Sequence, residues 1–127
     1  MSDLIELNTF SDNRGNLTVV EDYEIPFRIK RIFYIYELDE SNRGGHRHKK
    51  TCQALICLKG KCKVRVNDGK DIITYVLDKP KKCLLLEPKD WHILTDFERG
   101  SIILVCASEY FDESDYVFEE YKLNGKQ

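Results

Sequence analysis

The sequence predicts an all-β protein, a sandwich or barrel built from many short strands. Runs rich in β-branched and aromatic residues recur at short, even intervals and are separated by Gly, Pro, Asn and Asp. No segment before residue 109 keeps the helical period of about 3.6 residues over roughly ten positions. Between two of the runs, the residues Asn67-Asp68-Gly69 are typical of a hairpin turn.

The expected strands follow one another along the chain. NLTVVED comes after the turn-like residues 12–15, and IKRIFYIYEL ends at DESNRGG. TCQALICLKG and KCKVRV flank Lys59-Gly60, and the series ends with DIITYVL, KCLLLE, WHILTDF and SIILVCASEY. The remaining tail is acidic and aromatic, so we expect it to be irregular or to form a short helix from about Ser114. Without repeats or linkers, residues 1–127 are predicted to form one domain.

Composition excludes several classes of protein. The formal net charge of −2 over 127 residues does not favour nucleic-acid binding. No apolar run approaches the roughly 18 residues of a membrane span, and the N-terminal residues lack the basic and apolar regions of a signal peptide. The five cysteines show no C-x-x-C spacing and mostly lie in apolar runs, so we expect buried free thiols. These observations predict a cytoplasmic protein without nucleic-acid or membrane partners.

Two of the three histidines stand one residue apart, in GGHRHKK. In a strand, residues i and i+2 point to the same face, so His46 and His48 should project together and Arg47 away from them. Further along the same run, Cys52, Ala54, Ile56 and Leu58 share that phase and are small or apolar, as an inward face requires. This phase places both imidazoles at the mouth of the barrel interior.

A Gly, an H-x-H, an apolar strand closed by Gly60 and a later Pro-turn-His92 together resemble the cupin pattern. The usual cupin carboxylate ligand is missing, because Cys52 and Gln53 occupy its two alternative positions. Three interpretations stay open. The histidines and a thiol could hold Zn²⁺, the histidines could be structural, or they could transfer protons, since an imidazole titrates near neutral pH.

More of the chain resembles the nucleotide-sugar 3,4-ketoisomerases, the WxcM-like cupins. The resemblance runs from Asp12 to Tyr121 and rests on SDNRGNLTVVED, IPFRIKRIFYIYEL, RGGHRHKK, ALICLKGKCKV, DWHILTDF and LVCASEYFDESDYV, in that order. It implies a small cupin-type β-barrel (a jelly roll) and a homodimer with strands exchanged between subunits. It also implies an enzyme that needs no metal and no organic cofactor.

The resemblance further implies a reaction. Members act on dTDP-4-keto-6-deoxy-D-glucose and move its carbonyl from C4 to C3. The product is normally aminated next, to give 3-amino sugars for antibiotics or for surface glycans such as lipopolysaccharide or the S-layer. A metal-dependent cupin enzyme and a non-catalytic cupin that binds nucleotide sugars are the alternative functions.

Such a reaction needs acid and base groups beside neighbouring carbons and donors for the developing oxyanion. We therefore assign His48 as the base at C3 and His46 as its partner in proton delivery or oxygen polarisation. Tyr34 matches the family's active-site tyrosine and would donate to a sugar oxygen.

The remaining site residues are assigned to substrate binding. Arg14, Arg31 and Arg43 lie in the matching motifs and are candidates for the diphosphate, because arginine can grip phosphate oxygens through two parallel hydrogen bonds. Trp91 could stack on the thymine or the sugar, and His92 matches the histidine of the second cupin motif. The Arg14-Gly15 dipeptide resembles the branch that gives the 3-keto-6-deoxygalactose product.

Overall fold

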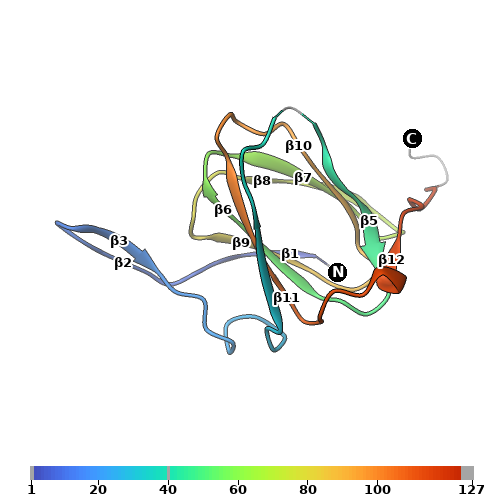
Figure 1. Ribbon diagram of the computed structural model, residues 1–127, viewed down its shortest axis with the longest axis horizontal. Coiled ribbons are helices and arrows are strands. Elements are labelled where there is room, and N and C mark those ends of the chain that lie inside the picture. Colours follow the sequence, from blue (N-terminus) through green and yellow to red (C-terminus); the bar gives the residue numbers. More distant parts are fainter. Residues whose placement is uncertain (1, 40, 124–127) are drawn as a thin grey trace.

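The computed structural model describes residues 2–39 and 41–123 and consists almost entirely of β-strands. One antiparallel sheet has the order β1 (Asp3–Glu6), β9 (Lys82–Leu86), β6 (Gln53–Lys59), β11 (Ile102–Ala107) and β4 (Arg31–Ile35). The other has the order β12 (Tyr116–Val117), β5 (Arg43–His48), β10 (Trp91–Thr95), β7 (Cys62–Asn67) and β8 (Ile72–Leu77). Figure 1 shows the two sheets facing each other in a jelly roll. The predicted all-β fold is confirmed, although the predicted domain also includes residues 1, 40 and 124–127, outside the described part.

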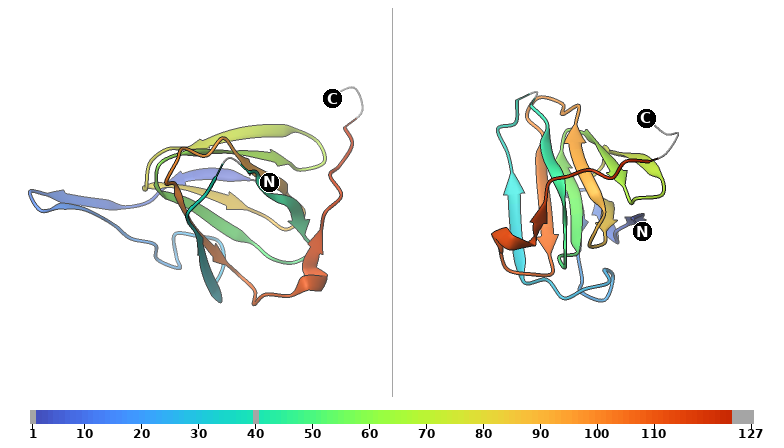
Figure 2. Two further views of the ribbon diagram at one scale, coloured as in Figure 1. Left: turned by 45° about the horizontal axis from the view of Figure 1, so that its top comes forward. Right: turned by 90° about the vertical axis from the view of Figure 1, so that its right-hand side faces the viewer.

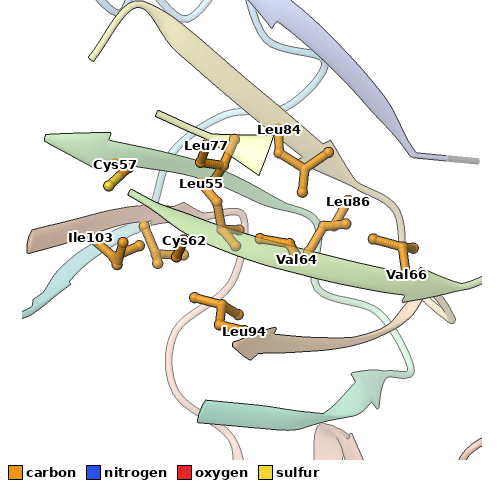
Figure 3. Close-up of a cluster of buried hydrophobic side chains, with 11 residues drawn as sticks. Leu55, Cys57, Cys62, Val64, Val66, Leu77, Leu84, Leu86, Leu94 and Ile103 are labelled. Carbon is orange, nitrogen blue, oxygen red and sulfur yellow. The ribbon is translucent and has the colours of Figure 1, made fainter. Parts of the chain in front are cut away.

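The main core lies between the two sheets, where both contribute large aliphatic side chains (Figure 3). Alternate residues of β7 and β6 point inward, so each strand supplies one side chain in two to this core. Its buried members are Leu55, Cys57, Cys62, Val64, Val66, Leu77, Leu84, Leu86, Leu94, Ile103 and Val105. At roughly 25 cal/mol per Å² of apolar surface removed from water, this burial dominates the free energy of folding.

A second cluster covers the outer face of the first sheet. It is formed by the other face of β6 and by the chain that leads into β4, and its buried members are Leu7, Ile25, Ala54, Ile56, Cys83 and Cys106. The strand β6 is therefore buried on both faces, which is unusual for an antiparallel strand and explains why it reads as a continuous apolar run.

The predicted phase of this strand is wrong. Gln53, Leu55 and Cys57 face the interior, whereas Ala54 and Ile56 belong to the outer cluster. The single strand predicted from the histidines onward is in fact two strands in different sheets, because the chain leaves β5 after His48 and crosses over before β6. That crossing interrupts the alternation of inward and outward side chains. Because both faces of β6 are apolar, the sequence does not show which face points inward.

The predictions for the hairpin turn and for the tail are confirmed. Strands β7 and β8 form the predicted hairpin around Asn67-Asp68-Gly69, with Gly69 at a φ of 92° that favours glycine. In the tail, a single 3₁₀ turn at Glu113–Asp115 leads directly into β12, so the irregular form is the correct one.

One hairpin does not pack on the body of its own chain. Within the described part of the chain, strands β2 (Thr9–Asp12) and β3 (Gly15–Thr18) pair only with each other, and all of their residues but Thr18 are exposed. Figure 1 and the left view of Figure 2 show this hairpin projecting away from the sheets. The cross-strand pair Phe10 and Leu17 is left largely open to solvent.

All five cysteines are free, as predicted, and all are buried except the half-buried Cys52. Within residues 2–39 and 41–123, no helix has the length and apolar character needed to cross a bilayer.

Candidate active site

A pair of glycines sets the direction of the two histidines on β5. His46 pairs with His92 of β10 and Gly44 pairs with Ile93, so Gly45 is an extra residue that bulges the strand. Gly44 and Gly45 both have positive φ values, 85° and 79°. A Cβ at Gly44 would lie 3.1 Å from the backbone oxygen of His92, so only glycine lets the two strands approach here.

Beyond this bulge, the predicted alternation holds. His46 and His48 face the same way with ring centroids 5.0 Å apart and perpendicular planes. Arg47 points to the other side of the sheet, where its guanidinium donates to the Tyr121 hydroxyl at 3.0 Å. The i, i+2 prediction for the histidine pair is confirmed.

His92 and Tyr116 complete a cluster of four rings. The His92 ring lies 4.9 Å from that of His46. Tyr116, which opens β12 and pairs with His48, lies 4.7 Å from His46 and 4.5 Å from His48. Three strands therefore bring these rings to one end of the space between the sheets.

The cluster borders a cavity of about 180 Å³ between the sheets. His46, His92 and Tyr116 line it from one side, together with Arg43, and the opposite sheet contributes mainly apolar side chains. The full lining is Phe33, Ile35, Arg43, Gly44, His46, Gln53, Leu55, His92, Leu94, Val105 and Tyr116. His48 is not part of the lining and is only 3% exposed, so it stands behind His46 and Tyr116.

Burial makes the histidines at the cavity neutral. It lowers the pKa of His46 to about 4, with a further contribution from the neighbouring His48. Burial and the nearby His46 lower the pKa of His92 to about 3. Near pH 7 each ring therefore carries one proton and one free lone pair, and can accept a proton.

His48 has a partner that the other two histidines lack. Its Nδ1 lies 2.8 Å from Oδ2 of Asp115, and both side chains are buried. The hydroxyl of Thr51 also donates to Oδ2, and the amides of Lys49 and Lys50 donate to Oδ1 at 3.0 and 2.8 Å. Burial lowers the pKa of His48, against the raising effect of Asp115.

The carboxyl of Asp115 stays ionised. Burial raises its pKa, but the hydrogen bonds from Thr51, the Lys50 amide and His48 outweigh burial and hold the pKa below its usual range. The buried pair is therefore a carboxylate and a neutral imidazole.

Two of the predicted arginines lie near this site. Arg43 lines the cavity beside Gly44. Arg31 stacks its guanidinium on Phe33 and Phe111, at 5.0 and 5.6 Å from the ring centroids, and its charge contributes to lowering the pKa of His48. Within the described residues, the buried Nε of Arg31 has no hydrogen-bond partner.

Tyr34 and Trp91 lie on the wrong faces of their strands to reach the cavity of their own chain. Tyr34 is 63% exposed on the outer side of β4, while its neighbours Phe33 and Ile35 line the cavity. Trp91 lies opposite His92 across the plane of β10. Its Nε1 donates to the Phe118 oxygen at 3.0 Å, so it anchors the end of the chain.

Arg14 and Gly15 lie at the turn of the projecting hairpin, away from the histidines of their own chain (Figure 1). The Arg14 side chain is 86% exposed and forms a 2.6 Å ion pair with Asp12. The single chain therefore does not bring these two residues to the cavity.

Sequence reasoning missed Asp115 and Tyr116. Both stand in the FDESDYV motif, to which the sequence analysis assigned no chemistry. An acidic, aromatic tail is ordinarily a solvated one, and only the pairing of β12 with β5 shows that these side chains turn back toward the histidines.

The ligand set at the cavity is a poor one for metals that prefer carboxylates. Gln53, whose position can carry the carboxylate in other cupins, is buried and lines the cavity with an amide. Among the residues that the structure describes, no group of three or more histidines, cysteines and carboxylates is placed to hold a metal ion.

Comparison with known proteins agrees with this geometry. A family model described as "FdtA: WxcM-like, C-terminal" matches residues 1–124. The chain belongs to the FdtA family. A curated member, TDP-4-oxo-6-deoxy-alpha-D-glucose-3,4-oxoisomerase of Aneurinibacillus thermoaerophilus, is 41% identical over 116 residues, which are 90% of this chain and 84% of the relative.

Two solved structures similar to this FdtA-family chain are also sugar isomerases. A 3,4-ketoisomerase of Helicobacter canadensis has a TM-score of 0.89 at 35% identity, with 93% of this chain and 90% of the other covered. QdtA of Thermoanaerobacterium thermosaccharolyticum, a sugar 3,4-ketoisomerase in complex with TDP, has a TM-score of 0.89 at 40% identity, with 93% and 88% covered. A mutant of QdtA has been solved with TDP-4-keto-6-deoxyglucose. The resemblance found in the sequence is confirmed.

Proposed function

We propose that this protein is a sugar-nucleotide 3,4-ketoisomerase that converts dTDP-4-keto-6-deoxy-D-glucose to a dTDP-3-keto-6-deoxyhexose. The observation that carries the proposal is the neutral His46 in the wall of the cavity, with the His48–Asp115 pair behind it. The names of the relatives support this choice of substrate, since the curated relative and QdtA act on or bind the same TDP-linked sugar.

Moving a ketone from C4 to C3 transfers two protons and no electrons from outside. A base removes the C3 proton and O4 takes up a proton, which gives the enediol; the C3 hydroxyl then gives up its proton and C4 receives one. The C3 proton is weakly acidic, so the base must lie within hydrogen-bonding reach, about 3 Å, and be unprotonated at working pH. His46 lines the cavity in which the sugar would bind, and its pKa is lowered to about 4, so it is unprotonated at neutral pH.

This assignment reverses the one made from the sequence. The sequence analysis made His48 the base at C3 and His46 its partner, with no geometric reason to prefer that order. Because His48 is buried behind His46, we assign proton abstraction to His46 and give His48 the partner's role, in which it exchanges a proton with His46. Burial in a site with few polar neighbours also strengthens the electrostatic interaction between the two rings.

The developing negative charge on O4 requires a donor that is already in place. Tyr116 is our candidate, since it lines the cavity and its ring is packed on both His46 and His48. It replaces Tyr34, which points out of the barrel.

The diphosphate requires cations at the open end of the cavity. Arg43 lines the cavity, and the guanidinium of Arg31 lies over the rings of Phe33 and Phe111, with its Nε unpartnered within the described residues. A guanidinium binds phosphate oxygens through parallel hydrogen bonds, so we assign both residues to the diphosphate.

We propose that the working form is a homodimer that exchanges the β2–β3 hairpin. This ribbon pairs only with itself, exposes Phe10 and Leu17, and carries Arg14 away from the cavity of its own chain. Exchange would bury that ribbon against the partner and bring Arg14-Gly15 to the partner's sugar. The small Gly15 would then set how the ring sits relative to the proton donor, which supports the galacto product.

We further propose that the enzyme needs neither metal nor cofactor and works in the cytoplasm. Free thiols are typical of a reducing compartment. The 3-keto product is a substrate for amination, so the enzyme fits a pathway to 3-amino-6-deoxysugars of surface glycans.

Incubation with dTDP-4-keto-6-deoxyglucose in D₂O, followed by NMR, tests the proposal. We expect a 3-keto product with deuterium at C4. In a parallel reaction in H₂O the product keeps H4, whose coupling to H5 distinguishes the galacto from the gluco product. An unchanged substrate spectrum would refute the isomerase function.

A further inference from the structure

A single buried carboxylate ties the end of the chain to the catalytic cluster. Asp115 belongs to the 3₁₀ turn at Glu113–Asp115, only 3% of it is exposed, and both of its oxygens are used. We propose that Asp115 is a positioning residue for catalysis, which fixes the tautomer of His48 and stabilises the His48 imidazolium that forms during proton transfer. This inference rests on the proposed isomerase function.

The hydrogen bonds determine the tautomer. Oδ1 of Asp115 accepts from the backbone amides of Lys49 and Lys50, and Oδ2 accepts from the hydroxyl of Thr51. Since amides can only donate, Oδ1 is an acceptor, and the lowered pKa of Asp115 leaves Oδ2 an acceptor as well, as in an ionised carboxylate. Nδ1 of His48, 2.8 Å from Oδ2, must therefore be the nitrogen that carries the proton.

The other nitrogen of His48 is then free to accept a proton. Within the described chain, its Nε2 is buried and finds no hydrogen-bond partner. An unpaired buried polar atom costs about 1–3 kcal/mol, so its retention calls for a reason. The ring of His48 packs against the rings of His46 and Tyr116, both of which line the cavity, so a proton that enters this cluster finds a free lone pair at Nε2.

The arrangement also stabilises the charged state of His48. Burial disfavours an imidazolium, and the positive charge of Arg31 adds to this effect. Among the described residues, the carboxylate of Asp115, in direct contact with Nδ1, opposes these two influences. A buried carboxylate that orients an imidazole and stabilises its cation is a recurrent catalytic device.

The variant Asp115→Asn separates orientation from packing. The side-chain oxygen of Asn would take the place of Oδ1 and accept the hydrogen bonds from the backbone amides of Lys49 and Lys50, because these two groups can only donate. The Asn NH₂ would then occupy the place of Oδ2 and donate to Nδ1 of His48, which would move the proton to Nε2. We expect kcat to fall about 10²- to 10⁴-fold, while dTDP binding and KM change little.

Nitrogen-15 NMR of the imidazoles gives a readout that a structural role would not move. We expect the Nδ1–H tautomer of His48 in the wild-type protein and the Nε2–H tautomer in Asp115→Asn. The matched control is Asp112→Asn, which alters the exposed N-cap of the same turn and should leave both kcat and the tautomer unchanged.

Two outcomes would overturn the inference. One is wild-type kcat in Asp115→Asn with the tautomer inverted; the other is a fall in kcat with the Nδ1–H tautomer retained.

If Asp115→Asn does not fold, Thr51→Val tests the same carboxylate, because it removes one donor to Oδ2. This variant should raise the pKa of Asp115 without changing the tautomer of His48. The NMR tautomer of the wild-type protein is measured without substrate, so an absent isomerase activity would refute the proposed function and not the tautomer assignment.

Discussion

His46 of β5 and His92 of β10 are directly paired across the two strands, with ring centroids 4.9 Å apart. Two imidazoles this close cannot both be charged without strong repulsion, and burial opposes the charge of either. Burial lowers the pKa of both rings; His48 adds to the effect on His46, and His46 adds to the effect on His92, so both are neutral at physiological pH. Burial, with His48 beside it, thus keeps His46 in the form that can accept a proton.

Stability should depend on pH through His92. Its pKa is lowered from 6.5 to about 3 on folding, so between these values the unfolded chain binds more protons than the folded one. The free energy of unfolding therefore falls as the pH drops, and the contribution of His92 between pH 7 and pH 5.5 is about 1 kcal/mol. Urea unfolding at both pH values measures it. In His92→Gln this loss should be smaller by that amount, and an identical loss in both proteins would contradict the prediction.

Arg14 should act in the site of the partner subunit. Arg14→Ala and His46→Asn should each be inactive as homodimers. In a heterodimer of the two, an exchanged hairpin leaves one site with both residues intact, so about half of the wild-type activity should return. Co-expression with two different tags and tandem purification yields the heterodimer for assay. If Arg14 served its own chain, both sites would carry one lesion and no activity would return.

Trp91 should stabilise the end of the chain without binding nucleotide. Its Nε1 donates to the Phe118 oxygen, and the guanidinium of Arg65 stacks on its ring at 5.2 Å. Trp91→Phe should therefore lower the free energy of unfolding by about 1–2 kcal/mol and leave the Kd for dTDP unchanged. Calorimetry of dTDP binding decides, because a clear loss of affinity would instead support the stacking role predicted from the sequence.

Removal of metal should leave the activity intact. The cavity offers two neutral imidazoles and the amide of Gln53, with the positive Arg43 beside them, and Nδ1 of His48 is already bonded to Asp115. Such a set disfavours a divalent cation. We expect full isomerase activity after dialysis against EDTA and far less than one metal per chain by elemental analysis. Loss of activity in EDTA, restored by one metal ion, would favour a metal-dependent cupin enzyme.

The sequence was sufficient for the fold class and for the direction of the histidine pair, since both depend on local rules. Alternation along β5 predicted that His46 and His48 project together, and the Asn67-Asp68-Gly69 turn was identified from its residues alone. The phase of β6 was not predictable in this way. That strand is apolar on both faces, and which face meets the cavity depends on a crossing between sheets.

The site was predicted only in part, for a similar reason. His46, His92 and Arg43 meet at the cavity, whereas Tyr34 and Trp91 turn away from it because each lies one residue out of phase with an inward neighbour. Asp115 and Tyr116 reach the histidines because the two-residue strand β12 pairs with β5. Asp115 is 67 positions from His48 in the sequence. No local pattern in the sequence encodes such a contact.

The measurement that tests the central claim most directly is the loss of deuterium from substrate labelled at C3. If His46 removes the C3 proton, wild-type enzyme should release the label and His46→Asn should release none while still binding dTDP. His48→Asn should still break the C3–D bond, although more slowly. Release of the label by His46→Asn, with none from His48→Asn, would contradict the account and return the base to His48.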